Sequence, residues 1–146
     1  MWRRIMFVVI LVAISLTGFG ATNDNGLAQL IDRANAAPVD QQPHLYTEIA
    51  ERQLKYADQL YTADDVARAR TVVTDVVSYA DRASDASIQS GKHLKDTEIA
   101  MRKMSVKLRD MKRKLTFEDQ APLQTASDHL ETLRTTLLSH MFKGQK

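Results

Sequence analysis

Two pairs of side chains have the residue types and the spacing of metal ligands. His44 and Glu48 are four residues apart, and His93 and Asp96 are three apart, so each pair would share one face of a helix. Imidazole nitrogens and carboxylate oxygens both bind zinc. Two ligands specify a metal only loosely, and a surface histidine beside a carboxylate is the simpler interpretation. We therefore assign no metal-binding residue and no cofactor.

The sequence motifs that would indicate catalysis are missing. The sequence contains no Gly-x-Ser-x-Gly nucleophile motif and neither Glu-x-x-His nor His-Glu-x-x-His. It also contains no cysteine, which excludes thiolate nucleophiles, cysteine-ligated zinc and disulfides. Asp64-Asp65 and Glu118-Asp119 are paired acids, but each pair precedes a predicted helix, where negative charge complements the helix dipole. We assign no catalytic residue and expect a protein that is not an enzyme.

Positive charge is concentrated in one segment. Residues 92–114 carry nine bases against three acids, whereas residues 21–91 carry 11 acids against six bases. Such a cluster suits docking onto an anionic surface or an acidic protein, and no aromatic residues interleave with it as nucleic-acid binding would favour. The simpler explanation is that these bases face acids of the first half of the chain or lie on ordinary solvated faces. The predicted interaction patch is Lys103, Lys107, Arg109, Lys112, Arg113 and Lys114.

The same segment carries a regular apolar pattern. Two series recur every seven residues and form an a/d heptad seam: Leu94, Met101, Leu108 and Leu115, and Thr97, Met104 and Met111. Ile99 and Val106 are also seven apart but lie opposite this seam. We expect a second neighbouring helix to bury them, and the alternative is a face for a partner or for a second copy of the chain.

The elements that position these residues are predicted to be helical. Between residues 44 and 121 there is no proline and a single glycine, Gly91, and the apolar residues recur at helical spacing. Helices are expected from about 43 to 61, from 63 to about 90, from 92 to about 115, and over 123–141. Thr62 and Thr116 are the expected capping residues. Pro122 suits a first helical turn.

The expected fold class is all-α, an antiparallel up-down bundle of about four helices. One alternative stays open. The apolar stripes before and after Gly91 share one heptad phase, so residues 63–115 would also fit a single long continuous helix with Gly91 inside it, at a cost of about 1 kcal/mol relative to alanine.

The N-terminus has the pattern of a secretory signal peptide. Arg3 and Arg4 precede an uncharged apolar run over residues 5–16, and small residues follow up to Ala21. We expect cleavage after Gly20 and export to the bacterial periplasm or the extracellular space; retention as a membrane anchor is the alternative. Residues 21–43 are expected to form a tether with a short helix, and residues 44–144 the bundle domain.

Two short segments resemble known helical families. The segment 61–69 resembles the turn of a tetratricopeptide-type hairpin, but it covers about one repeat unit and no second copy follows. The segment 115–120 is similar to the Leu-Thr-x-x-Gln motif of small periplasmic helical stress chaperones, with the glutamine one residue late. Neither resemblance assigns the chain to a family.

These observations predict an exported, non-enzymatic helical module for interaction or scaffolding, which binds a protein partner or an anionic membrane surface. The alternative is a small periplasmic helical chaperone or metal-stress sensor. Nucleic acid is not an expected partner, and a homo-oligomer is left open.

Overall fold

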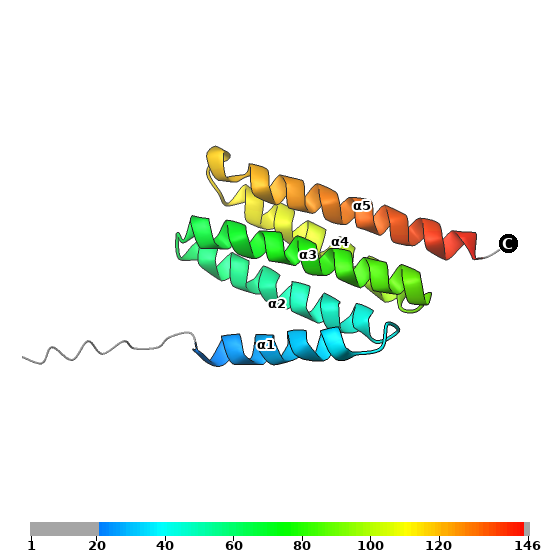
Figure 1. Cartoon of the computed structure of the whole chain (residues 1–146). Coiled ribbons are helices and arrows are strands. Elements are labelled where there is room, and N and C mark those ends of the chain that lie inside the picture. Colours follow the sequence, from blue (N-terminus) through cyan, green and yellow to red (C-terminus); the bar gives the residue numbers. More distant parts are fainter. Residues whose placement is uncertain (1–20, 145–146) are drawn as a thin grey trace, which may run out of the picture.

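The computed structural model describes residues 21–144, and every regular element among them is helical. This confirms the all-α prediction; the predicted signal peptide, residues 1–20, lies outside the described residues. The elements are α1 (Ala21–Ala36), α2 (Gln42–Thr62), α3 (Val66–Ser90), α4 (Leu94–Arg113), the short 3-10 helix η1 (Phe117–Asp119) and α5 (Ala121–Lys143) (Figure 1). None of the described helices is both long and apolar enough to cross a membrane.

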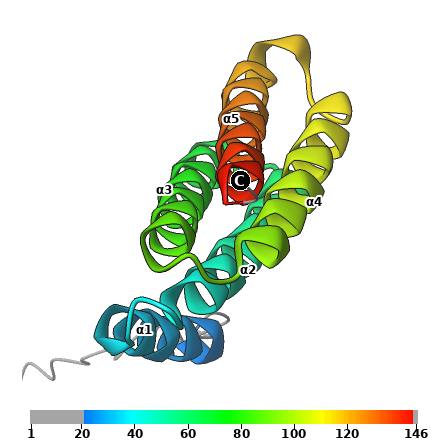
Figure 2. The same ribbon diagram turned by 90° about the vertical axis from the view of Figure 1, so that its right-hand side faces the viewer.

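The four long helices form two antiparallel hairpins, α2–α3 and α4–α5, which pack side by side. Viewed from the end, the order around the bundle is α2, α3, α5, α4 (Figure 2). Parallel helices are therefore neighbours, α2 beside α4 and α3 beside α5, and the chain crosses the diagonal between α3 and α4. The predicted compact up-down bundle is confirmed, with α1 added on the outside against α2.

The alternative of one continuous central helix is wrong, because the chain turns at Gly91. This residue adopts the left-handed conformation (φ 68°), and its N–H donates to the carbonyl of Ser87. Glycine adopts this conformation without steric cost and commonly terminates helices in this way. His93 also has positive φ (59°) before α4 begins. The shared heptad phase on the two sides of Gly91 thus does not reflect a continuous helix.

The predicted heptad seam is the part of α4 that the bundle buries. Met101 and Leu108 are fully buried, Met104 and Met111 are nearly so, and Thr97 donates or accepts a hydrogen bond with buried Ser87 of α3 (2.7 Å). The corresponding stripe of α3 consists of small residues: Ala69, Val73, Val76, Ala80 and Ala83. Small side chains there allow α2 and α3 to approach closely, and the seam residues fill the space between the hairpins.

The helix ends differ in detail from the prediction. Thr62 does not cap α3: it is the last residue of α2, and its hydroxyl donates back to the carbonyl of Asp58. Asp65 is the N-cap instead, and its carboxylate accepts from the N–H of Arg68 (3.4 Å). Thr116 precedes η1 rather than α5, while Pro122 lies in the first turn of α5 as expected.

The segment expected as a tether contains a 16-residue helix, α1. Leu30 and Ala34 are buried in the common core. The hydroxyl of Tyr46 on α2 donates to the side-chain oxygen of Asn35 (2.9 Å). These contacts fix α1 to α2, so the folded unit within residues 21–144 begins before residue 44.

Candidate functional site: the outer face of α4

Three of the six predicted patch residues are bonded to neighbouring helices. The amino group of Lys107 donates to Asp58 Oδ2 of α2 (2.6 Å), and Lys112 donates to Gln124 Oε1 of α5 (2.5 Å). Arg109 lies 3.4 Å from Glu131 Oε1, also on α5. Only Lys107 pairs with an acid of the first half of the chain, as the simpler explanation expected; Arg109 pairs with an acid of α5, and Lys112 donates to a neutral amide.

Glu131 is the centre of the polar contact between α4 and α5. Its Oε1 accepts from the hydroxyl of Ser105 (2.5 Å), and Arg134 approaches its second oxygen to 3.4 Å. The Ser105 hydrogen bond and the charges of Arg134 and Arg109 lower the pKa of Glu131, against a smaller opposing effect of burial. Arg134 also donates to Glu98 Oε1 of α4 (2.6 Å). Arg109 and Lys112 of the basic segment therefore help to hold α4 against α5 in the second hairpin.

The other three patch residues, Lys103, Arg113 and Lys114, are exposed to solvent. Arg113 pairs only with Asp110, one turn earlier on the same helix (3.3 Å, both side chains more than half exposed), and such a pair contributes little energy. Exposed Lys95 and Arg102 lie on the same side of α4, and no ion pair involves either of them within the described part of the chain.

These residues and the apolar pair opposite the seam define what we call the outer face of α4. Its members are Lys95, Asp96, Ile99, Arg102, Lys103, Val106, Asp110, Arg113 and Lys114. The neighbours of α4 are α5, α2 and the end of α3, and no other described helix covers this side (Figure 2). The outer face carries five bases against two acids, Asp96 and Asp110, so it presents a positive surface.

The expectation that a second neighbouring helix buries Ile99 and Val106 is wrong for Val106. Its side chain remains 42 % exposed, because α2 and α5 contact the other sides of α4. Ile99 is partly buried and lines a hollow beside α2. Just beyond α4, Phe117 of η1 is 90 % exposed and is the most exposed large apolar side chain that the structure describes.

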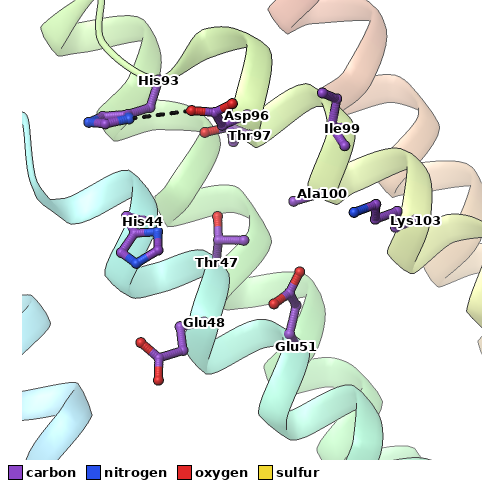
Figure 3. A pocket seen from close by; sticks show the side chains of 10 residues that line it. All are labelled: His44, Thr47, Glu48, Glu51, His93, Asp96, Thr97, Ile99, Ala100 and Lys103. Carbon is purple, nitrogen blue, oxygen red and sulfur yellow. Dashed lines mark ion pairs between the residues drawn. The ribbon is translucent and has the colours of Figure 1, made fainter.

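A hollow of about 530 Å³ lies between the N-terminal halves of α2 and α4 (Figure 3). It brings together both histidine pairs that the sequence singled out: His44 and Glu48 from α2, and His93 and Asp96 from α4. Glu51 and Lys103 extend toward each other across it. The hydroxyl of Thr47 at this hollow is buried and has no hydrogen-bond partner among the described residues.

The hollow does not form a metal site in this arrangement. His93 Nδ1 lies 3.7 Å from Asp96 Oδ2, so this pair interacts with itself. Across residues 21–144, no three histidine, aspartate or glutamate side chains lie close enough together to hold a metal ion. Four side chains of ligand type thus line one hollow, but their donor atoms do not converge.

Sequence reasoning missed Lys95 and Arg102, although a signal for them was present. Lys95 and Arg102 each precede one of Ile99 and Val106 by four residues, so they share the side opposite the seam. Counting charge along the segment hid this relation, because the count does not distinguish the sides of a helix. The exposure of Phe117 had no comparable signal, since it depends on how η1 leaves the bundle.

Comparison of the chain with protein-family models, with curated proteins and with solved structures gives no match. The functional inference therefore depends on the surface of this chain alone.

Proposed function

We propose that the chain is an exported, non-enzymatic helical interaction module that docks onto an anionic partner of the cell envelope through the outer face of α4. The observation that carries this proposal is the set of exposed bases on α4, Lys95, Arg102, Lys103, Arg113 and Lys114, of which Lys103 also lines the hollow beside α2. The signal-peptide pattern of residues 1–20 supports the export, and the missing catalytic motifs support a role in binding.

The bases of residues 92–114 include some that are bonded inside the bundle and others that are exposed, and this division supports the proposal. Lys107, Arg109 and Lys112 already have partners on α2 or α5, so releasing them for binding would cost internal contacts. The bases of the outer face have no such partners within residues 21–144, and a second molecule can reach them without any change in the bundle. Opposite charge on that molecule would also accelerate and orient the encounter.

The test compares two variants of equal charge change. In the first, Arg102→Glu and Lys103→Glu reverse two charges of the outer face; in the second, Arg33→Glu and Lys55→Glu reverse two exposed charges on α1 and α2. The measured quantity is the salt-sensitive association of each protein with isolated envelope fractions. We expect the first variant to lose most of this association and the second to keep it. Equal association of both variants with the wild type would refute the proposal.

Metal sensing is the second candidate function, because the fold brings His44, Glu48, His93 and Asp96 to one hollow. The donor atoms would have to converge by side-chain rotation, since no group of three holds a metal as the described residues now lie. This candidate predicts one zinc ion per chain by elemental analysis, lost in the variant His93→Ala. Zinc-free protein after loading and desalting would remove it.

A further inference from the structure

We infer that the anionic partner of the outer face is the headgroup layer of a phospholipid bilayer, on which α4 lies lengthwise. This inference deepens the proposed function and rests on it. The first observation is the order of residues around α4. By helical periodicity, Ile99 and Val106 form a line along the middle of the outer face. Lys95, Arg102 and Arg113 lie on one side of this line, and Lys103 and Lys114 lie on the other.

Helices that lie in the membrane interface combine apolar side chains with lysine and arginine, and the outer face of α4 combines them on a smaller scale. The apolar side chains enter the boundary between headgroups and acyl chains, while lysine and arginine side chains extend to the phosphates on either side. Val106 is available for this contact because it is 42 % exposed. Phe117, 90 % exposed directly after α4, adds a second exposed apolar group at the end of the helix.

The charges favour a diffuse anionic surface. Five bases of the outer face stand against two acids, Asp96 and Asp110, and a base near an anionic membrane strengthens binding about fivefold. The acids Glu48 and Glu51 lie beside the hollow on α2, and an anionic surface repels them. The bilayer is therefore expected to contact the row of Lys95, Arg102 and Arg113 more closely than Lys103, which extends toward Glu51 across the hollow.

The narrowness of the apolar line favours lipid over a folded protein partner. A stable protein interface needs a buried apolar core within about 800 Å² of surface on each partner. The outer face offers only Val106 and the partly buried Ile99 for such a core. A bilayer needs no complementary pocket or shape, so a few apolar contacts and several bases suffice there.

The experiment uses the chain that begins at Ala21, which contains every helix of the described bundle and excludes the apolar N-terminal run. Its binding to phosphatidylcholine vesicles is compared with its binding to vesicles that also contain phosphatidylglycerol. We expect binding only to the anionic vesicles, and weakening by raised salt. Lys95→Gln with Arg102→Gln should weaken it about 25-fold, whereas the matched control Arg33→Gln with Lys55→Gln should leave it unchanged.

A spectroscopic variant tests the orientation. The chain from Ala21 contains no tryptophan, so Val106→Trp introduces a single reporter on the outer face, and its emission should shift to the blue when anionic vesicles are added. The inference would be overturned by any of three results: no binding to anionic vesicles, an equal loss of binding in the two double glutamine variants, or a tryptophan emission that does not shift. If the protein does not bind anionic vesicles but its association with envelope fractions still depends on Arg102 and Lys103, the partner is an acidic protein or polymer. The proposed function then stands, and the inference of a bilayer is overturned.

Discussion

Replacing Glu131 by glutamine tests whether ionic contacts hold α4 against α5. The substitution preserves the shape of the side chain and its acceptor oxygen, so the Ser105 hydroxyl keeps a hydrogen bond. It removes the charge that Arg109 and Arg134 approach at 3.4 Å. Arg134 retains Glu98 at 2.6 Å, whereas Arg109 has no other ion pair within the described residues. The effect therefore comes from one carboxylate with a charge-assisted hydrogen bond and two neighbouring cations.

The expected loss is about 1.5 kcal/mol in the free energy of unfolding near neutral pH. Exchanging the charged acceptor for a neutral one removes roughly 1 kcal/mol from the Ser105 hydrogen bond. The charge lost beside the two guanidinium groups adds a few tenths more, a low value because the glutamate side chain is 32 % exposed and partly screened by water. The pKa of Glu131 is lowered in the folded protein, first by the Ser105 hydrogen bond. Its stabilisation is thus fully present above the unfolded-state pKa of about 4.3 and is lost as the pH falls through the lower folded-state pKa.

The assay is urea unfolding of the wild type and of Glu131→Gln at neutral pH and at a pH below the folded-state pKa. The difference between the two proteins should be about 1.5 kcal/mol at neutral pH and should vanish in acid, where both side chains are neutral. The control is Glu118→Gln in η1, which removes an exposed carboxylate without an ion pair among residues 21–144. A difference that persists unchanged in acid, or an equal loss in the control, would refute the reasoning.

Two further substitutions test the turn and the seam by thermal or urea unfolding. Gly91→Ala should lower the free energy of unfolding by about 1 kcal/mol because alanine is strained at φ 68°. An unchanged unfolding midpoint would mean that the turn tolerates a side chain. Leu108→Ala removes a fully buried side chain and should cost about 3 kcal/mol, whereas Val106→Ala should change stability by less than about 0.5 kcal/mol because that side chain is exposed. Similar losses at positions 106 and 108 would contradict the assignment of the outer face.

The apolar pattern was sufficient to predict which side of α4 is buried. Met101, Leu108 and the residues three after them recur with the heptad period, and this period reflects packing against partner helices. The helix bounds followed from the same periodicity with small errors at the ends. Thr62 was misplaced because several neighbouring polar residues suit an N-cap, and the backbone conformation decides among them. The sequence did not decide between a turn and a continuous helix at Gly91, because a glycine inside a helix lowers helix stability by only about 1 kcal/mol relative to alanine.

The functional surface was harder to predict because it depends on which neighbours α4 has. The basic segment surrounds the helix, so its residues face α2, α5 and solvent in turn. Only the packing order α2, α3, α5, α4 determines that Lys107 and Arg109 become internal while Lys95 and Arg102 stay exposed. A sequence count of bases identifies the right helix but not the side of it that is free.

The central claim, that the outer face of α4 is the binding surface, is tested most directly by site-specific photocrosslinking in living cells. A photoreactive amino acid is placed at Val106 on this face or, as the control, at exposed Ser78 on α3, which lies diagonally across the bundle. The account predicts that the probe at position 106 crosslinks to an envelope component and that Arg102→Glu with Lys103→Glu abolishes the adduct, while the probe at position 78 gives none. Equal crosslinking from both positions, or an adduct at position 106 that survives the charge reversal, would contradict it.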